Sequence, residues 1–402
     1  MSAGRLRQSV SAAIRAPGSA PRSPSGALPA LLSTGLLVVL GCSVGYRTDL
    51  HGPPRHAGQA EWPALRVVWG KQLVQRELLG YRPQEWSSAA IDERGTIYVG
   101  SSARRLLALA SDGHELWHLA TRGVVASRPL YHAETGAVYF GADDGQVYAV
   151  DARSGRLRWT FSTEGTIAHA PVYHDGVLLF TTSENRVYGI DARNGRWRWQ
   201  YDREPGDGFG MQGFAGVLVH DNLAFTGFSD GMLVALRPGS GALVWTRSLS
   251  GGAERFVDVD VTPVAVGGAV VAASHSGGVY ALAPETGAVQ WQLPIEGVVG
   301  LTATARRVFV SSVAVGVVAL NGLGRELWRQ GLPSGVPAAV LALGPYLLVT
   351  GTETGLFVVA AESGDLLQYF DPGHGFSAPA SAGSGLVVVL SNLGRLYALD
   401  FT

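Results

Sequence analysis

Short apolar runs separated by polar or glycine turns recur along the chain from residue 65 to its end. One unit covers residues 136–159 and reads GAVYFGADDGQVYAVDARSGRLRW; a close copy ends forty residues later at Trp199. Short runs rich in β-branched and aromatic residues, bounded by turn residues, predict β-strands. No helical periodicity of useful length follows residue 64.

Eight copies of this unit follow one another at a spacing near forty residues. Aligned on the residue inside the second run, the copies lie at Leu107, Tyr148, Tyr188, Val234, Tyr280, Val318, Val358 and Tyr397. Four strands per forty residues is the period of a β-propeller blade. The sequence therefore predicts an all-β fold, an eight-bladed β-propeller of four-stranded antiparallel blades over residues 65–402.

An aromatic residue closes each outer strand, and we expect it to be a wedge between neighbouring sheets. A buried indole covers about 150–250 Å², which corresponds to at most roughly 4–6 kcal/mol at ~25 cal/mol per Å². The eighth copy ends at Thr402 before its aromatic residue, so we expect the N-terminal strand around residues 66–73 to complete the last blade. The predicted blade-docking residues are Trp69, Trp117, Trp159, Trp199, Trp245, Trp291, Trp328 and Tyr369.

The first 42 residues have the pattern of an export signal. Four arginines and no acidic residue precede residue 27, residues 27–41 are apolar, and Cys42 follows. Fifteen apolar residues are few for a membrane span. The ending VLGC resembles a lipobox, which predicts a lipoprotein signal peptide over residues 1–42 and lipidation of Cys42. The alternative is an ordinary signal peptide with an incidental free cysteine.

Residues 43–64 are polar, contain three prolines and are predicted to be a flexible tether. Ser43 and Val44 differ from the aspartate that resembles an inner-membrane retention signal. We therefore expect a lipid-anchored protein on the outer membrane that faces the periplasm.

Composition and motifs argue against several classes of function. The net charge is −1, which leaves no basic footprint for nucleic acid. The segment GFSDG at 227–231 fits G-x-S-x-G and GFGMQG at 208–213 fits G-x-G-x-x-G, but neither has the strand–turn–helix context that these motifs need. The ten histidines form no H-x-H or H-E-x-x-H motif. We expect no catalytic residue, cofactor or metal.

Two consecutive links, after Trp199 and after Trp245, stretch the copy-to-copy spacing to 46 residues. Links between blades emerge on one face, so these two are expected to lie side by side. They place charges around apolar and aromatic residues, as in a protein-binding patch; the alternative is an ordinary solvated loop. The candidate partner-binding residues are Arg203, Phe209, Met211, Arg255, Phe256, Asp258 and Asp260.

The repeat A-x-D-x-x-T/S-G-x-x-x-W resembles the tryptophan-docking repeat of the pyrroloquinoline-quinone (PQQ) type propellers. Within that superfamily the chain resembles BamB, the lipoprotein of the β-barrel assembly machinery, most specifically in ERFVDVDVTPV at residues 254–264. That resemblance implies a scaffold whose Asp258, Asp260 and Arg255 contact the POTRA domains of a BamA-like partner. The family's Leu-x-Leu-Arg stretch is missing from the preceding link, which has Arg203 without the leucines.

Two other functions stay open from the sequence. One is a PQQ-type propeller scaffold for another envelope system, because the repeat says nothing about the partner. The other is a periplasmic enzyme or sensor that binds a quinone or a sugar at the axis of the ring. The quinoprotein dehydrogenases resemble this chain in blade count but are longer and carry adjacent cysteines, whereas this chain has one cysteine.

Overall fold

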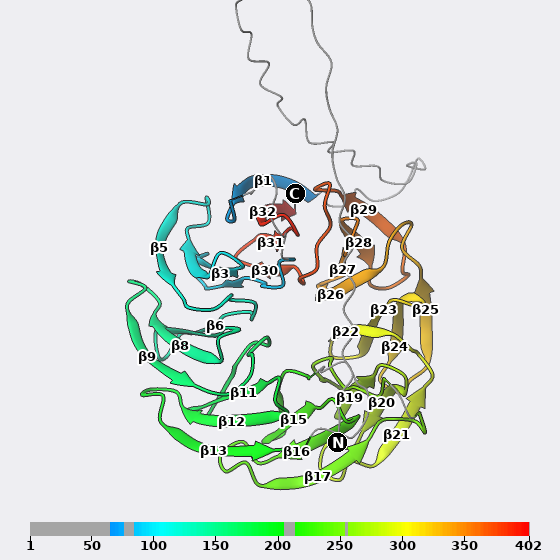
Figure 1. The fold of residues 1–402 in the computed structure, drawn as a ribbon. Helices are drawn as coiled ribbons and strands as arrows, with labels where there is room; N and C mark the ends of the chain where they lie inside the picture. The colour runs from blue at the N-terminus through cyan, green and yellow to red at the C-terminus, as the bar shows by residue number, and fades with distance from the viewer. Residues whose placement is uncertain (1–64, 76–83, 205–213, 254–255, 402) are drawn as a thin grey trace, which may run out of the picture. The chain divides into compact units, whose positions relative to one another are not determined.

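The computed structural model describes residues 65–75, 84–204, 214–253 and 256–401. Thirty-two strands form eight four-stranded antiparallel sheets, and the described residues contain no helix. Figure 1 shows the sheets arranged in a ring, with the first strand of each sheet nearest the axis and the fourth at the rim. The predicted eight-bladed propeller is confirmed.

Seven of the sheets consist of four strands that are consecutive in the chain. The first four such sheets contain β2(Ala90–Ile91), β3(Ile97–Ser101), β4(Arg105–Leu109) and β5(Glu115–Ala120); β6(Leu130–His132), β7(Ala137–Gly141), β8(Gln146–Asp151) and β9(Leu157–Ser162); β10(Val172–His174), β11(Val177–Thr182), β12(Arg186–Asp191) and β13(Trp197–Asp202); β14(Leu218–His220), β15(Leu223–Gly227), β16(Met232–Leu236) and β17(Leu243–Ser248). The next three contain β18(Val264–Val266), β19(Ala269–Ser274), β20(Gly278–Leu282) and β21(Val289–Leu293); β22(Val298–Ala303), β23(Arg307–Ser312), β24(Gly316–Asn321) and β25(Glu326–Gln330); β26(Pro337–Leu343), β27(Tyr346–Gly351), β28(Leu356–Ala360) and β29(Leu366–Phe370).

The eighth sheet joins the two ends of the propeller. It contains β30(Ser381–Gly383), β31(Leu386–Leu390), β32(Arg395–Phe401) and, as its outer strand, β1(Leu65–Gln72). β1 pairs antiparallel with β32, with Leu65 opposite Phe401 and Gln72 opposite Arg395. The expected closure by the N-terminal strand is confirmed.

The antiparallel order gives the ring two different faces. We call one the link face: it carries the turns between second and third strands and the links from one sheet to the next, such as residues 142–145 and 249–263. The other is the turn face, with the turns between first and second strands and between third and fourth strands, such as residues 133–136 and 151–156. β1 begins on the turn face, because Leu65 pairs with the end of β32.

The core lies between neighbouring sheets rather than at the axis. Central strands such as β7 and β11 are buried along their whole length, whereas outer strands such as β9 are mostly exposed. A strand that is covered on both faces reads as a continuous apolar run, which explains GAVYFG and GVLLFTT in the sequence.

Each of the predicted docking tryptophans lies inside its outer strand, not at its end as expected from the sequence, and contacts the outer turn of the next sheet. Its indole Nε1 donates to a main-chain carbonyl there, at 2.7–3.3 Å, in seven tryptophans. The ring lies against the glycine of the same turn, so that a Cβ at Gly155 would come within 2.6 Å of Trp117. The seven are Trp69, Trp117, Trp159, Trp199, Trp245, Trp291 and Trp328.

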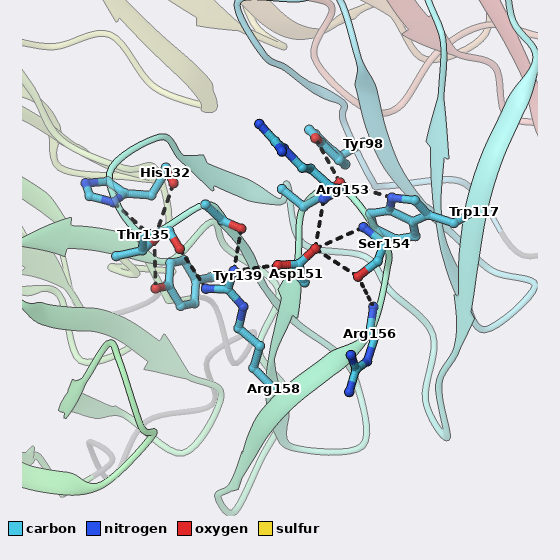
Figure 2. Close-up of polar contacts among 12 residues, drawn as sticks. Tyr98, Trp117, His132, Thr135, Tyr139, Asp151, Arg153, Ser154, Arg156 and Arg158 are labelled. Carbon is cyan, nitrogen blue, oxygen red and sulfur yellow. Dashed lines mark hydrogen bonds and ion pairs between the residues drawn. The ribbon is translucent and has the colours of Figure 1, made fainter.

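The aspartate of the repeat shapes the turn that receives the indole. Asp151 Oδ1 accepts from the backbone N–H and the hydroxyl of Ser154 at 3.0 and 2.8 Å, and Oδ2 accepts from the Arg158 guanidinium at 2.7 Å. Figure 2 shows this network with Trp117 of the preceding sheet beside it. The Arg158 hydrogen bond lowers the pKa of Asp151 to about 2. The motif is therefore a structural turn.

Tyr369 does not occupy the place of a tryptophan, contrary to the sequence expectation. Tyr369 lies opposite Phe357 and packs against the same core cluster as Trp328, between the sixth and seventh sheets. The equivalent position is Gln368, four residues after the turn glycine Gly364. Its side chain accepts from the Leu65 N–H at 2.6 Å and donates to the Leu65 carbonyl at 3.1 Å. A glutamine thus joins the seventh sheet to the closing strand.

We predict that Gly195→Ala destabilises the propeller by about 2–4 kcal/mol, through strain at positive φ and crowding of an indole. Gly195 has φ +70, and a Cβ there would come within 2.7 Å of Trp159. Urea unfolding measures the effect. Gly239→Ala is the control, since Gly239 has open space around it and no positive φ. Equal stability of the two variants would contradict this role of the turn glycine.

We predict that Gln368→Ala lowers the free energy of unfolding by about 1–3 kcal/mol, because both backbone groups of Leu65 lose their partner. Thermal unfolding is the measurement. Gln200→Ala, at an exposed outer-strand glutamine, should change stability by less than about 0.5 kcal/mol. A loss no larger than that of the control would show that ring closure does not depend on Gln368.

Candidate docking site on the link face

The two long links lie in contact on the link face. Thr262, in the link after β17, accepts at Oγ1 from the backbone N–H of Gly216, in the link after β13, at 3.1 Å. Thr181 of β11 donates to the carbonyl of neighbouring Ala215 at 2.8 Å. The described parts of the two links are therefore neighbours, as the sequence predicts.

Arg203 is engaged within its own chain. Its guanidinium Nε forms an ion pair with Asp230, in the turn between β15 and β16, and its backbone N–H donates to the Asn185 carbonyl at 3.1 Å. The same turn contacts the second link, because Val259 N–H donates to the Phe228 carbonyl at 3.1 Å. Arg203 thus braces the turn on which the second link rests.

Phe256 is the exposed aromatic residue of the site. It is 47% exposed, with a φ of +53, a conformation that is rare outside glycine and costs free energy. Its carbonyl accepts from the Ser276 N–H at 3.1 Å, and its ring centre lies 6.4 Å from that of His275. The turn between β19 and β20 therefore holds Phe256 in place.

Asp258 is buried, which differs from the expectation that it faces outward. Its exposed fraction is 2%, and its carbonyl accepts from the His275 N–H at 3.0 Å. Both of its carboxylate oxygens, together with Oδ1 of Asp260, are buried without a hydrogen-bond partner in the described part of the chain. A buried carboxylate without a partner is costly.

Burial changes the titration of both carboxylates. It raises the pKa of Asp258, and the neighbouring charge of Asp260 raises it further. Burial likewise raises the pKa of Asp260. In both cases the residue's own backbone N–H and the nearby His275 lower the pKa, with smaller effect than burial. The site is therefore a partly enclosed acidic pair that a cationic group could stabilise in its ionised form.

Several predicted residues lie outside the described residues: Cys42, Phe209, Met211 and Arg255. In the part of the chain that the structure describes, no group of three or more His, Cys, Asp or Glu side chains is placed to hold a metal ion. The described ranges also contain no helix that is long and apolar enough to cross a membrane. The GFSDG segment forms the end of β15 and the hairpin turn before β16.

Comparison with known proteins points to one family of propellers. A family model described as outer membrane protein assembly factor BamB matches residues 126–323, which include the second link. The protein of that name from Yersinia pestis is 29% identical over 271 residues, 65% of this chain and 68% of its own length. The one from Escherichia coli K12 is 28% identical over 321 residues, 75% of this chain and 81% of its own length. The chain is a BamB-like propeller of the PQQ type.

Solved structures share the fold. BamB from Moraxella catarrhalis matches with a TM-score of 0.71 and 21% identity, over 84% of this chain and 100% of that chain. A quinohemoprotein alcohol dehydrogenase from Comamonas testosteroni matches with a TM-score of 0.64 and 15% identity, over 84% and 76% of the two chains. At these identities the likeness concerns the propeller and carries no activity to the BamB-like chain.

We predict that Asp258→Asn stabilises the BamB-like chain by about 1–2 kcal/mol at pH 7, since a buried charge is removed. The folded pKa of Asp258 lies above its unfolded value, so the native state binds more protons, and wild-type stability falls as pH rises between these two values. The gain should therefore vanish below the unfolded pKa. Unfolding in urea across this pH range measures it.

Glu184→Gln provides the control for that comparison, because Glu184 is an exposed acid on the same face. It should leave the pH dependence of stability unchanged. If Asp258→Asn shows the same pH profile as wild type, Asp258 does not carry the buried charge.

Proposed function

We propose that this BamB-like chain is a non-catalytic scaffold for outer-membrane protein assembly that docks a BamA-like, POTRA-containing partner through the link face. The observation that carries the proposal is the acidic segment Asp258–Asp260, which lies in one of two contacting links and has three carboxylate oxygens without a hydrogen-bond partner among the described residues. The names of its relatives support the same process. The anchor expected at Cys42 would hold the scaffold at the outer membrane, on the periplasmic side.

The role of the acidic pair in docking follows from its electrostatics. A basic side chain of the partner would form charge-assisted hydrogen bonds with Asp258 and Asp260 in a site from which water is largely excluded. This pairing favours the ionised carboxylates and offsets the burial cost that the free chain bears. A buried unpaired charge lowers the stability of the free chain, and pairing with the partner's basic group would offset this loss.

Phe256 supplies the apolar part of the same contact. Phe256 is 47% exposed and precedes Asp258 by two residues, and aromatic residues are enriched where partners bind. Because Asp258 is 2% exposed, a partner cannot reach its carboxylate without displacing what covers it. We infer that docking moves the Phe256 turn, whose positive φ makes the resting conformation costly.

The test compares capture of the partner by two variants of equal charge change. Asp258→Asn with Asp260→Asn should reduce co-purification of a POTRA-containing protein at least roughly tenfold, because the desolvated charge pair is lost. Glu184→Gln with Glu296→Gln, two exposed acids of the link face, should reduce it by less than about twofold. Thermal unfolding confirms that both variants are folded.

Unchanged capture by the Asn pair would contradict the site. A photo-crosslinker at position 256 in whole cells identifies the partner directly. A BamA-like adduct supports the proposal, whereas an adduct with a protein of another envelope system would overturn the assignment to outer-membrane protein assembly.

A further inference from the structure

The turn face carries a group of arginines that no acid of the described residues neutralises. Five of them are exposed and lie in the outer turns of three consecutive sheets. We call them the arginine rim: Arg153, Arg156, Arg193, Arg196 and Arg237. In Figure 2 the guanidinium group of Arg158 is joined to Asp151, whereas those of Arg153 and Arg156 are joined to no side chain.

The neighbouring acids do not cancel this charge. Asp151 and Asp191 are already paired, with Arg158 and Arg198 at 2.7 and 2.6 Å. Three further acids, in the inner turns of the same sheets, lie closer to the axis than the rim: Glu134, Asp175 and Asp221. The outer edge of this arc is therefore locally cationic although the whole chain has a net charge of −1.

Exposed apolar side chains accompany the arginines. The first residue of each outer strand in these sheets projects into solvent: Leu157 is 51% exposed, Trp197 57% and Leu243 49%. Each follows its outer turn directly or nearly so. Basic residues interleaved with exposed tryptophan and leucine are the composition of surfaces that lie on a lipid interface.

The start of the propeller also lies on this face. Leu65 opens β1 at the turn face, and residues 43–64 separate it from Cys42. Twenty-two residues can extend to about 70–80 Å, so the tether does not prevent the rim from touching a bilayer that holds its other end. If the chain is anchored through Cys42 as proposed, the turn face can lie on the membrane while the link face stays free for a partner.

We propose that the arginine rim, with Leu157, Trp197 and Leu243, is a docking surface for the anionic phospholipid headgroups of the membrane that anchors the chain. The guanidinium groups contact headgroup phosphates, and the apolar side chains enter the interfacial layer. Attraction of basic side chains to an anionic leaflet falls off within a Debye length, so this contact depends on salt and on lipid charge. The anchor is part of the proposed function; the rim is a separate surface.

The test measures binding of the purified full chain carrying Cys42→Ala, which has no acylation site, to phospholipid vesicles. Vesicles with about 30 mol % phosphatidylglycerol are compared with phosphatidylcholine alone at about 50 and 300 mM salt. We expect stronger binding to the anionic vesicles that weakens with salt. In this background, Arg153→Glu with Arg193→Glu should weaken it roughly tenfold.

The matched control is Arg104→Glu with Arg122→Glu, two exposed arginines of the link face with the same change in charge. It should weaken vesicle binding by less than about twofold. Equal losses in both pairs, or binding indifferent to phosphatidylglycerol, would overturn the proposal. Capture of the POTRA-containing partner should be unchanged in the rim variant, so a failure of the rim is distinguishable from a failure of the docking site.

Discussion

The docking of an indole onto the glycine turn of the next sheet is the interaction on which the ring depends. Each repeat supplies both halves of this contact, but to different neighbours: Gly155 receives Trp117 from the sheet before, while Trp159 reaches the turn at Gly195 in the sheet after. The aspartate that shapes the turn therefore serves an interface rather than a reaction. Because each repeat binds the next copy of itself in the same way, sheets add in one direction until the last sheet meets the first and the ring closes.

Closure is where the repeat has to change. In the eighth sheet the third and fourth strands, β32 and β1, come from opposite ends of the chain, so no turn with a glycine connects them. An indole at position 368 of β29 would have no such turn to contact, and Gln368 hydrogen-bonds instead to both backbone groups of Leu65. The missing turn in the eighth sheet thus explains why the seventh sheet has a glutamine where the other sheets have a tryptophan.

The features that every repeat shares could be predicted from the sequence, whereas those that depend on a single contact could not. Blade number, strand order and the closing strand follow from apolar runs and turn residues, which act locally. The sequence favours Tyr369 as a docking residue because it lies eleven positions after Val358, the spacing from Tyr148 to Trp159. The spacing of four residues after the turn glycine, here Gly364, instead leads to Gln368. Asp258 is buried where its segment pairs with the turn at His275, which belongs to the next sheet, and the residues around Asp258 do not predict that contact.

The two faces of the ring carry charges of opposite sign, so each face favours a different kind of neighbour. On the link face, the carboxylates of Asp258 and Asp260 are buried and have oxygens without a hydrogen-bond partner in the described ranges, so a cation would stabilise them. On the turn face, which is also where β1 begins, the guanidinium groups of the arginine rim are exposed and form no ion pair with the described residues, so an anion would stabilise them. A rigid propeller keeps the two surfaces apart, so each can be satisfied by a different neighbour at the same time. The net charge of −1 does not reveal this separation, because it adds together the acidic residues of one face and the basic residues of the other.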